Sequence, residues 1–375
     1  MEILAMHMAN ELLSVPVAAI TLLVAGGAIA VTARRAQKTL DPEWLPLMGV
    51  MGAFVFAAQM INFTLPGMPG TSGHLGGGVL LAILLGPSAA IITMASILTI
   101  QCLIFQDGGL LALGCNIINM GIVPCILGWW LYRVVSGKDA VVPAWRQYIA
   151  AWAGCLLGVT AGAALVPIES AFAGRLSIPV THFLAVMIGV HLLIGVVEGA
   201  ITFAVLAYLR QARPACLGLA AAAQKENISR KAVALSLVIT ALLLAGVVSW
   251  FASTKPDGLE WSYLDHKYAQ AQSAIKRPSG TIDAVDELQT KYAPLPDYSA
   301  RPTHMGAVGA ENTDEAPSDD AWPNINGWTS LAGVVGTAVT LVAVYAVAIL
   351  LGRNKRVLGS GPSLTSGRSE CITTI

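Results

Sequence analysis

Long apolar runs with few charged residues are the feature that most constrains how this chain can fold. Charged residues make up only 12% of the sequence, whereas soluble domains carry about 25%. In lipid, every backbone polar group must find its partner within the protein, so spanning runs predict helices. We therefore expect an all-α integral membrane protein. The runs long enough to cross a bilayer, which takes about 20 residues of helix, cover 15–33, 44–63, 87–106, 109–133, 147–168, 182–209, 231–252 and 329–352.

Basic residues predict how these helices are oriented. They gather after the first run, at 133–146, at 210–231 and after the last run. Basic residues favour the cytoplasmic ends of spans, and all four clusters are cytoplasmic only if the shorter stretch 76–86 also crosses. That reading predicts nine spans, with a helix restarting at Pro87. We expect a multi-pass protein of the bacterial plasma membrane, with the N-terminus outside and the C-terminus in the cytoplasm.

Charge and spacing also divide the chain into parts. Residues 1–210 hold seven closely spaced spans, and 211–230 read as a cytoplasmic linker. Residues 231–352 hold two spans joined by a long outer loop, 253–328. This loop contains twelve Asp or Glu residues and six Lys or Arg residues. The polar composition of this loop predicts that much of it is loosely ordered. The remaining residues, 353–375, form a cytoplasmic tail.

Two histidines stand out because this orientation puts both of them at the outer face. His7 precedes the first span, and His74 lies in a Gly- and Pro-rich stretch after the second. Irregular backbone at membrane depth is tolerated where it is buried in protein or lines a cavity. Two imidazoles beside such a pocket suit Ni(II), Co(II) or Cu(II). The alternative is that either residue is an ordinary loop histidine without a ligand role.

Several stretches carry a resemblance to a known family. MHMANELLS (6–14), GTSGHLGGGVLLAILLGP (70–87), QDGGLLALGCNIINMG (106–121) and HLLIGVVEGAITF (191–203) resemble the cobalt/nickel substrate-binding component of energy-coupling-factor transporters, the CbiM/NikM family. KPDGLEW (255–261) resembles the small PDGLE-type component, fused here to the large one. The resemblance implies a seven-helix bundle followed by a two-helix membrane domain with a long extracytoplasmic loop. It leans towards nickel without excluding cobalt.

The family resemblance also implies a ligand set. The ligands would be the terminal amine of Met6, the amide nitrogen and imidazole of His7, and the imidazole of His74. Four nitrogens in a plane suit Ni(II) or Cu(II). Five residues, MEILA, precede Met6 in this sequence and would block the amine. We hypothesise that the functional chain starts at Met6 or loses those five residues.

Other polar residues are weaker candidates for hydrogen bonds that orient these ligands. Helix-to-helix hydrogen bonding is the alternative reading for each. Asp107 is instead expected to make a turn or cap a helix. The candidates for the orienting role are Asn62, Ser72, Asn116, His191 and Glu198.

The chain lacks a phosphate-binding GxxxxGK[ST] loop, so it is not expected to hydrolyse ATP itself. The family resemblance implies partners: a coupling subunit of the CbiQ/NikQ type and ATP-binding subunits of the CbiO/NikO type. We expect no resident cofactor, and nickel(2+) or cobalt(2+) as the transported ion. Two alternatives stay open, a self-sufficient metal permease or channel and a membrane scaffold or sensor.

Overall fold

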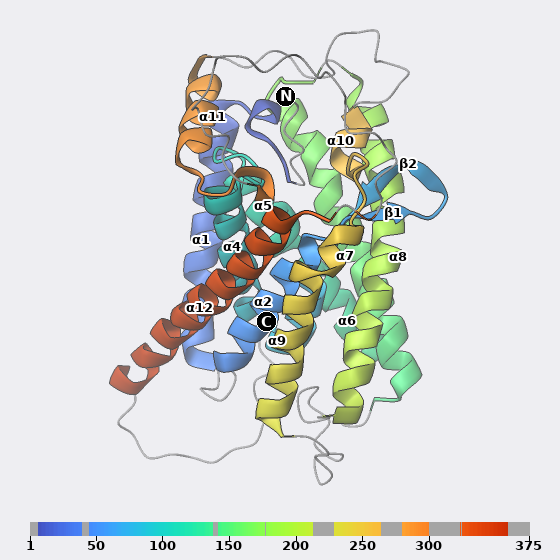
Figure 1. Ribbon diagram of the computed structural model, residues 1–375, viewed down its shortest axis with the longest axis vertical. Helices are drawn as coiled ribbons and strands as arrows, with labels where there is room; N and C mark the ends of the chain where they lie inside the picture. Colours follow the sequence, from blue (N-terminus) through green and yellow to red (C-terminus); the bar gives the residue numbers. More distant parts are fainter. Residues whose placement is uncertain are drawn as a thin grey trace.

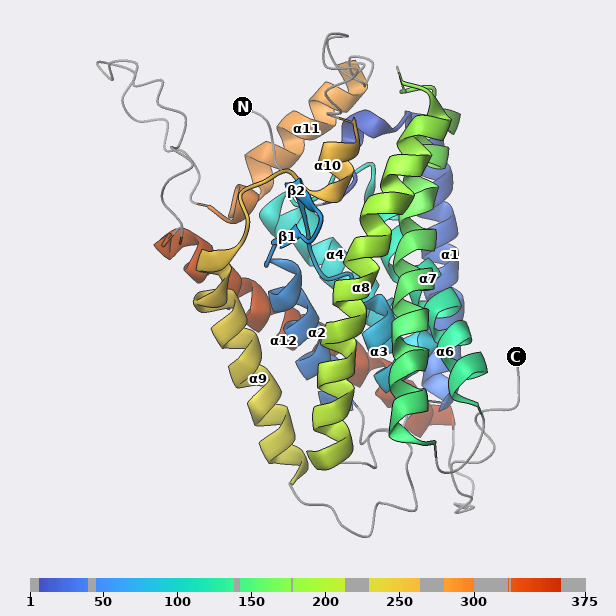
Figure 2. The same ribbon diagram turned by 90° about the vertical axis from the view of Figure 1, so that its right-hand side faces the viewer.

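The protein is a bundle of membrane-length helices with smaller elements gathered at one end (Figures 1 and 2). The computed structural model describes residues 7–39, 45–137, 142–176, 178–212, 229–263, 280–299, 323 and 325–358.

Helices occupy all of the predicted spanning runs. Six helical stretches are long and apolar enough to cross a membrane: Val15–Thr39, Pro87–Phe105, Leu113–Ser136, Ala144–Phe172, Val180–Ala212 and Gly327–Gly352. In order, these belong to α1 (Val15–Thr39), α4 (Pro87–Phe105), the run from α5 (Leu113–Asn116) through α6 (Trp129–Ser136), α7 (Ala144–Phe172), α8 (Val180–Ala212) and α12 (Gly327–Leu358). The shorter helices are α2 (Leu45–Gln59), α3 (Gly78–Leu85) and α9 (Arg230–Gly246). The multi-pass membrane fold is thus confirmed, while the number nine stays a prediction.

Two breaks in the helices follow from local sequence. Gly86 has a φ of 83°, which ends α3, and α4 begins at Pro87 as the sequence predicts. Proline suits this place because the first helical turn needs no N–H donor there. Between α5 and α6 the helix widens into two π-helical stretches, Ile117–Ile122 and Pro124–Gly128. Such widenings are frequent at functional sites.

One hydrophobic core is shared by both halves of the chain. Most of α2 is buried, and its surroundings include α4, α9 and α12. Glycine permits the close contacts: the backbone of α12 approaches Gly49 of α2, and a Cβ added there would meet Leu341 O at 3.0 Å. Figure 1 shows α12 running obliquely across the bundle. The two halves therefore pack as one body around a common interior.

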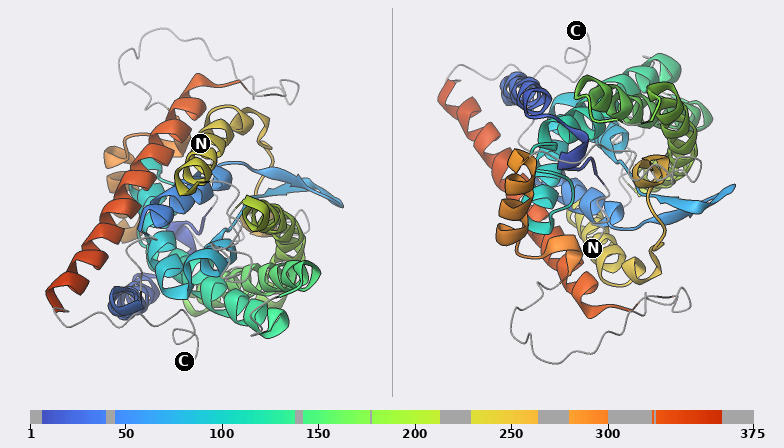
Figure 3. Two further views of the ribbon diagram at one scale, coloured as in Figure 1. Left: turned by 90° about the horizontal axis from the view of Figure 1, so that it is seen from below. Right: turned by 90° about the horizontal axis from the view of Figure 1, so that it is seen from above.

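A short antiparallel hairpin adds to the all-α class. β1 (Phe63–Leu65) pairs with β2 (Met68–Gly73), with Phe63 opposite Gly73. Gly67, with a φ of 84°, makes the turn between them. Figure 3 shows the hairpin projecting from the side of the bundle.

The described parts of the long acidic loop contain helices, whereas the prediction that much of the loop is loosely ordered falls largely on residues outside the described ones. The loop holds α10 (Gly258–Tyr263), α11 (Gly280–Tyr292) and a short turn, Pro296–Tyr298. The carboxylate of Asp257 accepts the Glu260 N–H at 2.8 Å and so caps the start of α10. A composition-based reading misses these elements because they are short and are stabilised by contacts with the first half of the chain.

Candidate metal centre

Three chain segments converge beside the C-terminal end of α4 and the N-terminal half of α8. Residues 7–13 lie against loop 106–112, where the Gly109 N–H donates to Met8 O at 3.0 Å. The Asn116 side chain holds Met8 on both sides, accepting from its N–H at 3.0 Å and donating to its carbonyl at 3.1 Å. This pair of hydrogen bonds fixes the backbone beside His7, as pairing with a neighbouring β-strand would.

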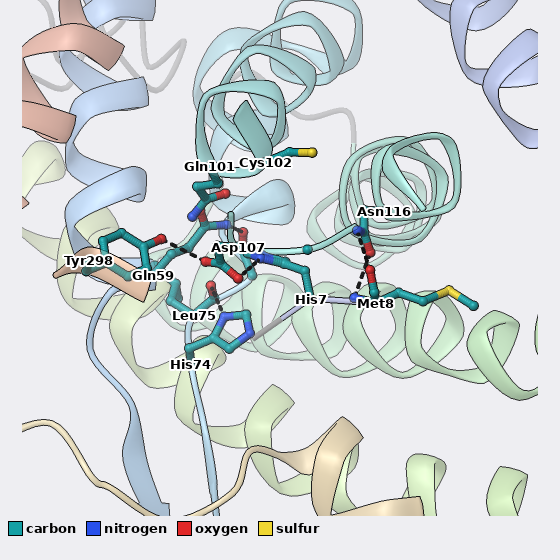
Figure 4. A network of polar contacts seen from close by, with 12 residues as sticks. His7, Met8, Gln59, His74, Leu75, Gln101, Cys102, Asp107, Asn116 and Tyr298 are labelled. Carbon is teal, nitrogen blue, oxygen red and sulfur yellow. Dashed lines mark hydrogen bonds and ion pairs between the residues drawn. The ribbon is translucent and has the colours of Figure 1, made fainter. Parts of the chain in front are cut away.

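A carboxylate orients the His7 ring. His7 is 2% exposed, and its Nδ1 lies 2.6 Å from Oδ1 of Asp107. The other oxygen of Asp107 accepts from the Tyr298 hydroxyl at 2.7 Å (Figure 4). The second ring nitrogen of His7, Nε2, is buried without a hydrogen-bond partner among the described residues. A buried polar atom of this kind needs an explanation.

The end of α4 places Asp107. Gln106 adopts a φ of 56°, and the Asp107 N–H bonds back to Gln101 O at 3.1 Å. This left-handed turn ends the helix. Gly108 follows with a φ of 86°, and a Cβ there would meet His7 Cβ at 2.9 Å. Only glycine therefore allows the two segments to approach this closely.

His74 lies beside His7 in a loop that is held from two sides. The two imidazole centroids are 5.4 Å apart, and the rings are inclined at 64°. Nδ1 of His74 lies 3.1 Å from Leu75 O. The next residues are tied down by Glu198, which accepts from the N–H groups of Gly76 at 2.7 Å and Gly77 at 3.2 Å. The loop that carries His74 is thus anchored to α8.

A cavity of about 90 Å³ opens beside both histidines. It runs from the histidines along α7, α8 and the π-helical stretches. Within the described part of the chain, no three His, Cys, Asp or Glu side chains come together as a complete metal site. Two imidazoles alone would not saturate a transition metal, so a metal held here would need further ligands from the backbone, the chain terminus or water. The cavity wall includes His7, His74, Asn116, Asn119, Met120, His191, Glu198 and Asp257.

The surroundings of the histidines are acidic. Burial raises the pKa of Asp107, but the neighbouring His7 and the Tyr298 hydroxyl outweigh it and bring that pKa below its ordinary value. Burial raises the pKa of Asp257 to about 7, although the Glu260 N–H acts in the opposite direction. A buried carboxylate in contact with His7 favours a cation nearby.

The structure sorts the residues proposed from sequence. It brings His7, His74 and Asn116 together, and it places His191 and Glu198 on the same cavity. Met6 lies outside the described residues.

Two other candidates contact the second half of the chain. The Ser72 hydroxyl donates to the backbone carbonyl of Lys255 at 2.8 Å. The backbone carbonyl of Asn62, rather than its side chain, accepts the Ser253 N–H at 2.7 Å. Neither lines the cavity. Their observed contacts are with residues 253–256, so an orienting role for these two stays a prediction.

Two residues of the centre were missed by sequence reasoning. Asp107 was expected to make a turn or a cap, yet its carboxylate holds His7. Tyr298 lies 191 positions away in sequence from Asp107, and no local pattern relates the two. The adjacent Gly108-Gly109 was the available signal that the backbone approaches another segment closely here.

Comparison with known proteins identifies the families to which the two parts of the chain belong. Residues 7–216, more than half of the chain, match the family described as the cobalt uptake substrate-specific transmembrane region. The chain belongs to this family. Residues 231–353 match the PDGLE domain, so members of two families are fused here.

Relatives of the family include metal transport proteins from archaea and bacteria. A putative metal transport protein of Haloquadratum walsbyi is 38% identical over 56% of this chain and 92% of its own length. The fused nickel transport protein NikMN of Rhodobacter capsulatus is 29% identical over 78% of this chain and 88% of its own. A crystal structure of a transition metal transporter is 30% identical, covers 55% of this chain and 92% of its own, and has a TM-score of 0.46.

Proposed function

We propose that the chain is the substrate-specific membrane component of an energy-coupling-factor importer, which captures Ni(II) or Co(II) at the outer face. The observation that carries the proposal is the pair of imidazoles, His7 and His74, whose centroids lie 5.4 Å apart beside a cavity. Membership of the cobalt uptake family supports it. ATP hydrolysis falls to separate partners, a coupling subunit of the CbiQ/NikQ type and ATP-binding subunits of the CbiO/NikO type.

The proposed ligands are Met6 through its amine, His7 through its amide nitrogen and imidazole, and His74 through its imidazole. Four nitrogens in a plane suit Ni(II) better than Co(II). The amine is available only in a chain that begins at Met6, which intact-mass measurement of the purified protein determines. Metal content and the visible absorption of the nickel-loaded protein then report the ion and its coordination geometry.

The orientation and division of the chain belong to the same proposal. The N-terminus and the loop 253–328 face outward, and the linker 211–230 and the tail 353–375 face the cytoplasm. The Asn10 side chain, close to His7 in sequence, donates to Asp286 and Gln289 of α11 in the acidic loop, which supports a common side for both. Labelling of single cysteines placed at Gly280 and in the linker, by a reagent that does not cross membranes, tests it: only the cysteine at 280 should react in intact cells.

Uptake measurements separate the proposal from its alternatives. Cells that make the chain together with the coupling subunit and ATPases should accumulate radioactive nickel, and cells with the chain alone should accumulate far less. Equal uptake by the chain alone would favour a self-sufficient permease. His74→Ala should abolish accumulation while the protein still inserts into the membrane. Unchanged uptake with this variant would refute the ligand role of His74, and uptake that does not depend on the chain at all would favour a scaffold or sensor.

A further inference from the structure

The hydrogen bonds of the two imidazoles determine which nitrogen of each ring can bind a metal. Nδ1 of His7 faces the Asp107 carboxylate at 2.6 Å, and Nδ1 of His74 faces the Leu75 carbonyl at 3.1 Å. Both partners only accept hydrogen bonds, so Nδ1 carries the proton in each ring. In a neutral imidazole the other nitrogen, Nε2, then keeps the lone pair that coordinates a metal.

The spacing of the rings fits a shared ion. An imidazole–metal bond is about 2.1 Å long, so each ring centre lies roughly 3 Å from the ion and two such rings stand roughly 4.5–6.5 Å apart. The observed separation of 5.4 Å falls within this range. Nε2 of His7 is also the buried nitrogen without a partner among the described residues, and His7 lines the cavity.

A relay from the second half of the chain holds His7 in this orientation. The Tyr298 hydroxyl donates to Asp107, whose other oxygen accepts from His7. The Tyr298 ring stacks on Phe105 with centroids 4.7 Å apart. Carboxylates that accept the outer N–H of a metal-bound histidine fix its tautomer and direction.

Gln289 of α11 strengthens the same connection. Its side chain donates to Gly108 O at 2.8 Å and accepts the Leu110 N–H at 3.0 Å. The loop that carries Asp107 is therefore held by α11 as well as by α4. The relay is preformed across the two halves of the chain.

This orientation conflicts with the chelate in the proposed ligand set. A metal bound to the backbone amide nitrogen of a histidine reaches Nδ1 of the same ring, because Nε2 points away from the backbone. Nδ1 of His7 is the nitrogen that Asp107 occupies. The chelate and the Asp107 hydrogen bond therefore exclude each other at this atom.

We propose that Tyr298 and Asp107 position His7 so that a divalent ion is first held by Nε2 of His7 and of His74, a mode that requires no free amine. Water completes the coordination. The chelate would form afterwards, when the metal moves from Nε2 to Nδ1 of His7 in place of Asp107, the ring proton moves from Nδ1 to Nε2, and the backbone amide of His7 releases its proton to water. This inference rests on the proposed function, and it deepens it by adding two positioning residues and an earlier binding step.

The test compares two forms of the full chain, one that keeps MEILA and one that begins at Met6. Binding of Ni(II) and of Co(II), each supplied as the simple salt, is measured by competition with a chelator of known affinity. The form that keeps MEILA should bind more weakly, without the absorption of square-planar nickel, and His74→Ala should abolish this binding. In that form Asp107→Asn should weaken binding about 10-fold or more, in the range found for groups that orient metal ligands.

Tyr298→Phe should weaken binding in the same form by a smaller factor, because the carboxylate remains while its hydroxyl support is lost. Tyr292→Phe and Asp283→Asn are the matched controls, since both residues are exposed on α11, and neither should change the affinity. A thermal unfolding curve in detergent identifies any variant that fails to fold.

The outcomes separate the two proposals. If the form that begins at Met6 binds metal and the form that keeps MEILA does not, the early two-imidazole mode is refuted and the proposed function stands. Unchanged affinity with Asp107→Asn and Tyr298→Phe refutes the relay. If neither form binds nickel or cobalt, the proposed function itself fails.

Discussion

Glu198 is a buried carboxyl group that anchors the backbone after His74. It is 1% exposed in α8, and both of its oxygens accept N–H groups from the segment that follows His74. A Cβ at Gly76 would meet its Oε2 at 2.9 Å, so the contact requires glycine there. The loop that presents His74 is therefore defined by one carboxylate and two glycine N–H groups.

Glu198→Gln should weaken this anchor, because the amide has a single acceptor oxygen and its NH₂ would face an N–H group. An unsatisfied buried donor costs about 1–3 kcal/mol, so we expect a lower unfolding temperature in detergent and weaker retention of nickel. Thermal unfolding and metal content measure both effects. Glu287→Gln, at an exposed position of α11, is the matched control. Equal stability of the Glu198 variant would show that the carboxylate is dispensable.

At the scale of elements, α10 is the link between the hairpin and α8. The Ser72 N–H donates to Pro256 O at 2.9 Å, and Ser72 and Asp257 form a parallel bridge. Gly258 then begins α10 against α8, where an added Cβ would clash with the side chain of Val190. The PDGLE segment thus closes one side of the cavity, and its glycine permits the close approach.

Gly258→Ala should displace α10 from α8 and weaken metal retention, since this segment lines the cavity. Hydrogen exchange of residues 255–263 should become faster in the variant, because the hydrogen bonds to the hairpin would be strained. Gly280→Ala at the start of α11 is the control, as no atom of the described residues lies within 4 Å of its added Cβ. Exchange rates and metal content that match the unchanged protein would contradict the docking role of Gly258.

The long helices could be predicted because each one must satisfy its backbone and bury its side chains over a fixed length of lipid. His7 and His74 could be singled out for a similar reason, since polar side chains close to membrane-spanning segments are costly and therefore often functional. The contact between Asp107 and Tyr298 could not be predicted, because it depends on how distant segments pack. The helix Gly280–Tyr292 also escaped prediction, because its buried contacts lie on a different part of the chain.

The whole molecule is organised around an interior to which both halves contribute. Gly336 of α12 lies against Phe56 of α2 and Phe105 of α4 so closely that an added Cβ would clash with both rings. Overpacking of a core costs about 1–3 kcal/mol. Gly336→Ala should therefore lower the unfolding temperature, whereas Gly327→Ala should leave it unchanged, since no atom of the described residues lies within 4 Å of its added Cβ. Thermal unfolding in detergent decides between these outcomes.

The shared core also predicts that the halves stay together without a covalent link. A protease site introduced within 213–228 allows the purified protein to be cut into two fragments. Because α9 and α12 pack on α2, we expect both fragments to elute together from a sizing column in mild detergent. Separate elution would mean that the linker, rather than packing, holds the halves in place.

Fusion of the halves has a consequence for how often Tyr298 occupies its place. A short tether gives the joined partners an effective concentration on the order of 1 mM. A contact with a dissociation constant of about 0.1 mM would then be engaged roughly nine-tenths of the time. Two separate proteins would reach that occupancy only if the cellular concentration of the partner were also on the order of 1 mM. In this chain one messenger RNA delivers both partners in equal number, so even a weak contact at the histidines is nearly always made.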